Sequence, residues 1–423
     1  MSEDAESRRK FVRRLVILGS VAGVAIAGGG LLGLSLLRNK GQNNSTTTES
    51  SSSLGTTSAT QRTTATSTPT TSAQTGSTQQ SSTTSGNSTS IPIAPFSQTF
   101  ESWSKLRGVC WRWESLSLHP DQPNGPDPTV AFPFMRSMDM NFVRVDNVNM
   151  DSMINDPSYA SKLKQVADYA DANGVYCDYF SGMGVLQGQF PQDFYWPYAN
   201  GQRSGYTAFM TDLANNYMTL SNPPNLVNGM YRGYLPLEAV YQLYLKPILQ
   251  IVDSHVSTVA YGFLNEPNGI TGDQVHTMLE YWAGRIRSDF GSNKAIIFQT
   301  AAGGVDATRA ATAAPTKDLA PFVYEYHDYS QRNLESAAVQ AAQSVGGVTA
   351  YLGEWGGPAF GSTGYESGFD TAINQIKNGS IPSTYYSLLY DSGSGVELMN
   401  TNGNPTAKGQ YLSQDYKTIL GVV

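Results

Sequence analysis

Two glutamates, Glu266 and Glu354, each come directly after a short apolar run of the β type. Glu266 lies in Asn-Glu-Pro, which follows the run 258–264. Glu354 lies in Gly-Glu-Trp-Gly and follows the run 348–353. If both runs are strands of one parallel barrel, both side chains point into the pocket at its carboxyl end. Two facing carboxyl groups are what hydrolysis of a glycosidic bond needs, because one protonates the leaving oxygen and the other meets the oxocarbenium-like centre.

Arg144 is a third residue that could take part in this chemistry, and it lies in the apolar run 141–146. A buried guanidinium requires an anion, and Glu354 is the obvious one. Such an ion pair would lower the pKa of Glu354 and keep it nucleophilic, whereas Glu266 has to stay protonated near the working pH. Retaining enzymes hold the two carboxyl groups about 5–5.5 Å apart and inverting enzymes about 6.5–9.5 Å apart. The sequence leaves this distance open.

The body of the chain, residues 93–423, alternates short apolar runs with helical patterns. The predicted strands are 105–110, 141–146, 174–180, 258–264, 294–299, 321–327, 348–353 and 384–390. The predicted helices lie near 159–172, 206–219, 236–253, 273–289, 331–344, 366–378 and 405–418. Eight strands separated by helices predict an α/β fold of the (β/α)8 TIM-barrel type. A doubly wound open sheet is the alternative, but no G-x-G-x-x-G follows any of the runs.

These motifs resemble those of clan A glycoside hydrolases, most closely glycoside hydrolase family 5, the large cellulase and mannanase family. The resemblance rests on Asn-Glu-Pro, on Gly-Glu-Trp-Gly and on the His-x-Tyr at 327–329. It implies a retaining double displacement in which Glu266 is the acid/base and Glu354 is the nucleophile. A sister family of the same clan fits these short motifs as well.

The resemblance also implies roles for four neighbouring residues. Asn265 would bond the 2-hydroxyl of the sugar that is cleaved, and Arg144 would hold the nucleophile ionised. His327 would line the pocket near the acid/base, and Tyr329 would orient Glu354. The chain departs from the family at two strand ends, because no His follows the run 174–180 and no Trp follows the run 384–390.

Aromatic side chains near the pocket are candidates for stacking on sugar rings, because β-linked pyranoses present apolar faces. The candidates are Trp111, Trp196, Trp355 and Tyr390. Trp196 lies in the longest insertion, 181–205, together with several other aromatic residues. The alternative for any Trp is a place in the hydrophobic core.

Composition and motifs exclude several other classes. After residue 90 the chain holds 19 basic and 30 acidic residues, and an acidic body disfavours nucleic acid as a ligand. The four histidines are scattered without an H-E-x-x-H, and no Gly-x-Ser-x-Gly elbow follows a strand, so we expect no metal, no cofactor and no serine esterase. The two cysteines, Cys110 and Cys177, could form one bridge or remain separate buried thiols.

The first 92 residues predict a membrane tether. Residues 1–14 are basic and predicted to be cytoplasmic, and residues 15–37 carry no charge and are long enough for a transmembrane anchor or an export signal of the twin-arginine type. Residues 38–92 form a Ser/Thr-rich linker, and Asn378 in the body lies in a glycosylation sequon. We therefore expect the body at the extracellular face of the membrane, or secreted.

Together these features predict a monomeric, retaining, endo-acting glycoside hydrolase that cleaves a β-1,4-linked neutral polysaccharide, either a cellulose-like β-glucan or a mannan. One alternative is an exo-acting β-glycosidase of the same clan. The other is a non-catalytic barrel that binds glycans at the cell surface, since a tether and a stalk suit such a protein equally.

Overall fold

The structure is a computed structural model. It describes residues 93–113, 125–146, 148–184, 198, 205–219, 226–300, 304–329, 334–356, 365–388, 398–400 and 402–420. The predictions for residues 1–14, 15–37 and 38–92 lie outside these residues and stay predictions. Among the described residues, no helix has the length and the apolar character needed to cross a membrane.

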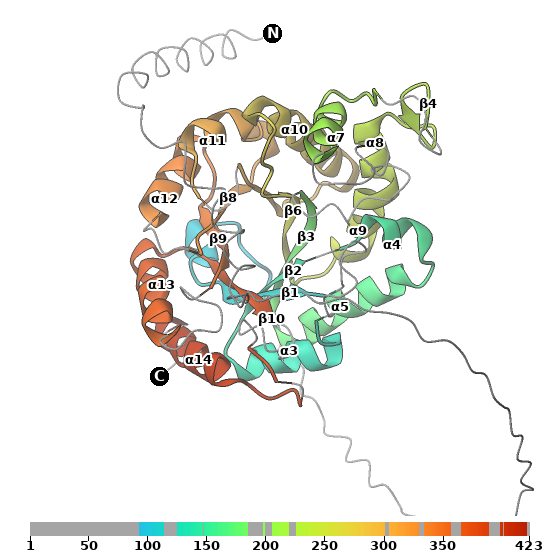
Figure 1. The fold of residues 1–423 in the computed structure, drawn as a ribbon. Helices are drawn as coiled ribbons and strands as arrows, with labels where there is room; N and C mark the ends of the chain where they lie inside the picture. The colour runs from blue at the N-terminus through green and yellow to red at the C-terminus, as the bar shows by residue number, and fades with distance from the viewer. Residues whose placement is uncertain are drawn as a thin grey trace, which may run out of the picture. The chain divides into compact units, whose positions relative to one another are not determined.

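Eight parallel strands close into a barrel in the order β1-β10-β9-β8-β7-β6-β3-β2. They are β1 Arg107–Arg112, β2 Phe142–Asp146, β3 Tyr176–Gly184, β6 Thr258–Asn265, β7 Ala295–Phe298, β8 Phe322–His327, β9 Ala350–Trp355 and β10 Ser383–Leu388. Figure 1 looks along this barrel and shows the helices arranged around the strands. Each strand overlaps one predicted apolar run, so the predicted (β/α)8 barrel is confirmed.

Helices cover the outside of the barrel. In chain order they are α2 Phe100–Trp103, α3 Pro128–Ser137, α4 Met150–Asn155, α5 Tyr159–Asn173, α7 Tyr206–Ala214, α8 Pro236–Val240, the π-helical η4 Tyr241–Leu245, α9 Lys246–Val252, α10 Gly272–Phe290, α11 Ala307–Ala313, the 3-10 turn η5 Lys317–Leu319, α12 Glu335–Ser344, α13 Tyr365–Gly379 and α14 Ala407–Leu420. A small antiparallel hairpin, β4 Leu226–Val227 and β5 Met230–Tyr231, precedes α8.

The helix α3 is absent from the sequence-based prediction. Pro128 occupies its first turn and Pro133 lies inside it, and an internal proline weakens a helical pattern. The helix forms because the Asp127 side chain accepts a hydrogen bond from Thr129 N at 2.9 Å and so caps it. The predicted helix 236–253 is present, but it consists of α8, η4 and α9 joined end to end.

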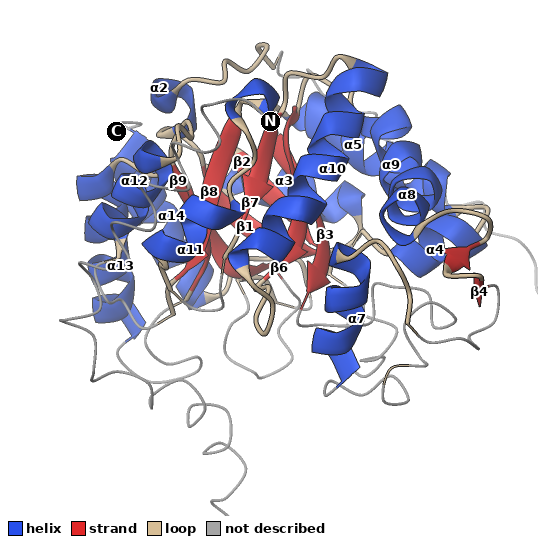
Figure 2. Cartoon of the chain, turned by 90° about the horizontal axis from the view of Figure 1, so that it is seen from above, coloured by secondary structure: helices blue, strands red, loops and turns tan. Residues whose placement is uncertain are grey.

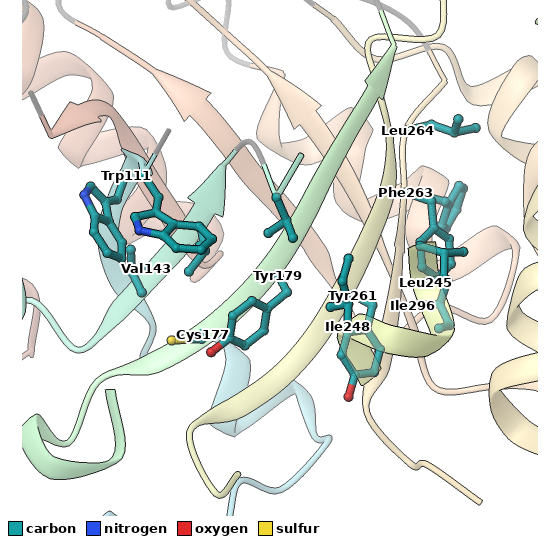
Figure 3. Packing of buried hydrophobic residues seen from close by; sticks show 14 of the residues in the cluster. Trp111, Val143, Cys177, Tyr179, Leu245, Ile248, Tyr261, Phe263, Leu264 and Ile296 are labelled. Carbon is teal, nitrogen blue, oxygen red and sulfur yellow. The ribbon is translucent and has the colours of Figure 1, made fainter. Parts of the chain in front are cut away.

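The hydrophobic core lies mainly between the strands and the helices. Figure 3 shows Tyr179 of β3 and Tyr261 of β6 in this layer, with Ile248 of α9 beside them. A second cluster, which includes Trp103, Leu106, Phe142 and Tyr351, fills the barrel at one end. Figure 2 shows α2 at that end and α7 at the opposite one. This second cluster fills the barrel at the amino-terminal ends of the strands, so a functional site can be open to solvent only at their carboxyl ends.

The two cysteines are free and buried. Cys110 turns into the barrel, where its thiol lies 3.1 Å from the carbonyl oxygen of Gly353. Cys177 belongs to the cluster between strands and helices. Cys110 pairs with Arg144, and Arg144 pairs with Asp178, so Cys110 faces the same side of the sheet as Asp178. Cys177 precedes Asp178 and faces the opposite side, so the structure has two separate buried thiols.

Candidate active site

The two glutamates meet at the carboxyl ends of the strands, as the sequence predicts. Glu266 follows the last residue of β6, and Glu354 lies near the end of β9. One carboxylate oxygen of each lies within 4.8 Å of the other, and a ring nitrogen of His327 lies within the same distance of both. His327 ends β8, where an irregularity in the register places it opposite Glu354.

Glu354 is buried and held at both oxygens. Its Oε1 lies 2.7 Å from Arg144 Nη1, and its Oε2 accepts a hydrogen bond from the Tyr329 hydroxyl at 2.5 Å. Burial alone would raise the pKa of Glu354. The cations of His327 and Arg144 and the hydrogen bond from Tyr329 together outweigh burial and hold the pKa below its usual value. Glu354 therefore has the charge and the fixed orientation that a nucleophile needs.

Glu266 has a different environment. Its side chain is 20% exposed, against 9% for Glu354, and His327 Nδ1 lies 2.8 Å from its Oε1. Its backbone is in the left-handed region, with φ 46°, which is strained for a residue with a side chain. A hydrogen bond of 2.8 Å from Glu266 N to Gln299 Oε1 supports this conformation. This backbone strain lies at the residue whose side chain faces both the solvent and Glu354.

Arg144 is the central cation of the site and is 1% exposed. Besides Glu354 it contacts Asp146 at 2.8 Å and Glu325 at 3.2 Å, and it donates a hydrogen bond of 3.0 Å to Asn265 Oδ1. The predicted contact between Arg144 and Glu354 is thus present. Arg144 also orients Asn265, because it occupies the amide oxygen of that side chain.

His327 lies between both glutamates and is fully buried. Its Nδ1 is 3.4 Å from Glu354 Oε2, and its Nε2 is 3.3 Å from Glu325 Oε1. Burial alone would lower the pKa of the imidazole, but the surrounding carboxylates, Glu354 first, outweigh burial and raise it to about 10. His327 is therefore an imidazolium at neutral pH.

The grouping of Glu266, His327 and Glu354 has the distances of a metal site, but its chemistry does not fit one. An imidazolium has no lone pair to offer a metal ion. Arg144 and Tyr329 already contact the two oxygens of Glu354. The three residues suit proton transfer and covalent chemistry better than metal binding.

Several buried polar residues of the site were not predicted from the sequence. They are Arg112, Asp146, Asp178, Gln299 and Glu325, together with the half-buried Tyr386. Burial, opposed by Arg144, raises the pKa of Asp146 to about 7. Strand alternation could have identified some of these residues, because Asp146 and Glu325 each lie two positions from a predicted site residue and so share its face.

Two of the predicted aromatic platforms are wrong. Trp111 and Trp355 are fully buried. The Trp111 ring centroid lies 5.4 Å from that of Phe132, and the Trp355 centroid lies 5.9 Å from Phe369 and 5.3 Å from Tyr385. The physical reason is again alternation, since Trp355 follows the inward-facing Glu354 and must point outward into the helix layer.

The other two predicted platforms, Trp196 and Tyr390, lie outside the described residues. A different aromatic residue, Tyr386 of β10, is half-buried, and its ring stands edge-on to Tyr329 with the centroids 6.2 Å apart. Arg112 donates a hydrogen bond to the Tyr386 hydroxyl and lies over its ring at 5.7 Å. Tyr386 thus packs against Tyr329, the residue that donates a hydrogen bond to the nucleophile.

A comparison with protein families matches the part of the chain that holds most of these residues. The model of the family described as cellulase (glycosyl hydrolase family 5) matches residues 244–392, which include Asn265, Glu266, His327, Tyr329 and Glu354. No curated protein matches the chain.

Among solved structures, a GH5-4 broad specificity endoglucanase from Ruminococcus champanellensis with bound cellotriose has a TM-score of 0.51 at 14% identity, over 73% of this chain and 95% of that chain. The catalytic domain of a Thermobifida fusca endoglucanase has a TM-score of 0.44 at 14% identity, over 74% and 91% of the two chains. The first likeness shows a shared barrel fold. The family match confirms the resemblance to glycoside hydrolase family 5 that the motifs around Glu266 and Glu354 indicate.

Proposed function

We propose that the protein is a retaining, endo-acting glycoside hydrolase that cleaves β-1,4-linked neutral polysaccharide, with a cellulose-like β-glucan as first choice and a mannan as second. The observation that carries the proposal is the placement of Glu354. It is an ionised carboxylate held by Arg144 and Tyr329, and an oxygen of the more exposed Glu266 lies within 4.8 Å of it. This short separation supports a nucleophile and an acid/base rather than two carboxyls with a water between them.

The reaction follows from these positions. The Glu354 carboxylate attacks the anomeric carbon while Glu266 donates its proton to the glycosidic oxygen, so a glycosyl ester forms as the bond to the leaving sugar breaks. Glu266, now a carboxylate, takes a proton from water, and the water oxygen attacks the anomeric carbon and releases Glu354. In this proposal Asn265, whose amide oxygen accepts a hydrogen bond from Arg144, bonds the 2-hydroxyl of the sugar that is cleaved.

The substrate class is proposed on two grounds. The family that matches is described as cellulase. The acidic body, with 30 acidic against 19 basic residues after residue 90, repels polymers of uronic acid and suits a neutral glycan. The endo mode of action and the choice between glucan and mannan are part of the proposal and depend on the test.

The test is product analysis with purified full-length protein on hydroxyethyl-cellulose, glucomannan and mannan, which are all uncharged. We expect a ladder of oligosaccharides, and proton NMR should show the β-anomer of the new reducing end first. Monosaccharide released from chain ends alone would contradict endo action and support an exo-acting β-glycosidase. Binding without cleavage would support a glycan-binding barrel, and a first product of α configuration would contradict retention.

We also propose that residues 15–37 hold the enzyme at the outer face of a membrane and that residues 38–92 act as a stalk. An uncharged run of this length supports an anchor, and the exposed Asn378 at the end of α13 suits glycosylation. Carbonate extraction of membranes and protease treatment of intact cells test the proposal. Release of the protein by carbonate would contradict the anchor, and protection from protease would contradict the outward orientation.

A further inference from the structure

Glu325 lies on β8, two positions before His327 and on the same face of the strand, and it is fully buried. One of its oxygens, Oε1, is 3.2 Å from Arg144 Nε and 3.3 Å from His327 Nε2. A single atom thus touches both of the cations that face Glu354. We propose that Glu325 is a positioning residue, which fixes Arg144 and His327 beneath Glu354 and keeps His327 in its imidazolium form; the catalytic consequence rests on the proposed function.

Gly353 shows that the chain makes room for this carboxyl group. A Cβ atom on Gly353 would lie 1.7 Å from Glu325 Oε1 and 2.4 Å from its carboxyl carbon. Neither contact is possible, so any other residue at 353 must displace Glu325. The glycine that precedes the nucleophile is therefore required by the side chain of Glu325 on the neighbouring strand.

His327 has two possible partners at Nε2, and they require different charge states. Glu325 Oε1 can only accept, so this contact needs a protonated Nε2. Gln299 Nε2, 3.2 Å away, can only donate, because the amide oxygen of Gln299 already accepts from Glu266 N. At the other ring nitrogen, Nδ1 lies 3.4 Å from Oε2 of the ionised Glu354, which can only accept, so Nδ1 carries a proton in either case. A neutral ring would therefore accept from Gln299 at Nε2, whereas an imidazolium donates to Glu325. The charge on Glu325 therefore selects the state of His327.

The other titratable groups around Glu325 do not replace its charge. Arg144 and Asp146 face it from β2, Asp178 from β3 and Tyr351 from β9. Asp178 is fully buried, and burial first, then the Glu325 carboxylate, raises its pKa well above the usual range. Burial likewise raises the pKa of Tyr351. Both shifts favour the neutral form, so Asp178→Asn is a matched control that changes a buried carboxyl group of the same cluster and leaves Glu325 in place.

The direct test is ¹⁵N NMR of the histidine rings in the full-length protein, where His327→Gln assigns its signals among the four histidines. In the wild type we expect both ring nitrogens of His327 to be protonated from pH 7 to 9, and in Asp178→Asn the same. In Glu325→Gln the His327 titration should fall by about one to three pH units, since one opposite charge is lost. Glu325→Asp, which keeps the charge, should lie between the two.

The results that overturn the proposal are clear. A neutral His327 in the wild type at pH 7 overturns it without any variant. An unchanged His327 titration in Glu325→Gln also overturns it, as does an equal fall in Asp178→Asn. If Glu325→Gln does not fold, the wild-type and Glu325→Asp titrations decide the question.

Activity gives a second measurement. The His327 cation faces both glutamates, and in Glu325→Gln it should lose its proton at a lower pH, so the alkaline limb of kcat/KM should move to lower pH with KM little changed. Gly353→Ala should produce the same shift, because it displaces Glu325. An unmoved alkaline limb in an active Glu325→Gln protein counts against the proposal. Failure of the wild type to cleave any glycan would instead defeat the proposed function, and the His327 titration would still test Glu325.

Discussion

Removal of one hydroxyl from the site should change its pH dependence in a defined direction. Tyr329→Phe deletes the hydrogen bond of 2.5 Å to Glu354 Oε2 and keeps the ring that stands against Tyr386. A hydrogen bond to a charged group contributes about 1.5–3 kcal/mol. Because Glu354 is buried, solvent screening reduces this value little.

The sign follows from the charge state that the bond favours. The Tyr329 hydroxyl donates to the ionised form of Glu354, so its loss raises the pKa of Glu354. At about 1.36 kcal/mol per pKa unit, the acid limb of kcat/KM should move up by about one to two pH units. At the optimum the rate should fall less than about tenfold, because the nucleophile loses orientation but gains basicity.

The assay is kcat/KM against pH on a soluble β-glucan. Tyr324→Phe is the matched control, because it removes a tyrosine hydroxyl from β8, close to Tyr329 in the chain. The Tyr324 hydroxyl lies 3.0 Å from Thr300 Oγ1 and contacts neither glutamate. The control should keep the wild-type profile. An acid limb that stays in place in Tyr329→Phe, or that moves to lower pH, would refute this account of how Glu354 is kept ionised.

Four other changes test the remaining assignments. Glu354→Gln should lower kcat by several orders of magnitude with glycan binding retained, and a variant with a tenth of the wild-type rate would exclude Glu354 as nucleophile. Glu266→Ala should slow unactivated substrates far more than aryl glycosides with good leaving groups, and azide should partly restore the rate; equal losses without azide rescue would contradict an acid/base role. Trp111→Ala should lower the free energy of unfolding by about 3–5 kcal/mol, measured by denaturant titration, with KM unchanged, whereas a raised KM on a stable fold would restore Trp111 as a sugar contact. Deletion of residues 1–92 should leave kcat and the melting temperature unchanged, and loss of folding would show that this segment is structural.

Much of the fold and the two glutamates could be predicted from the sequence for a specific physical reason. Buried parallel strands have short apolar sequences, and the carboxyl ends of such strands lie together at one end of a closed barrel. Glu266 and Glu354 come directly after two such runs, so their meeting follows once the barrel closes. The contact of Arg144 with Glu354 was predictable as well, because a buried guanidinium needs an anion.

Successive side chains of a strand face opposite sides of the sheet, and the predictions of Trp111 and Trp355 as sugar contacts did not use this rule. Trp355 directly follows Glu354, so an inward glutamate requires an outward tryptophan, and the structure places Trp355 in the helix layer. Glu325 stands two positions before His327 and therefore faces the same interior. The helix α3 escaped prediction because Pro133 interrupts its pattern, while the Asp127 cap and packing against the barrel stabilise it.

The sequence by itself determined which segments form the strands and the types of residue at their carboxyl ends, since both follow from short-range patterns. Only the tertiary structure decided the distance between Glu266 and Glu354, the charge on His327 and the part played by Glu325 and Gly353. Those properties arise from contacts across different strands, in a dry interior where the carboxylates around His327 together outweigh burial. The distances between strands are set only when the barrel closes.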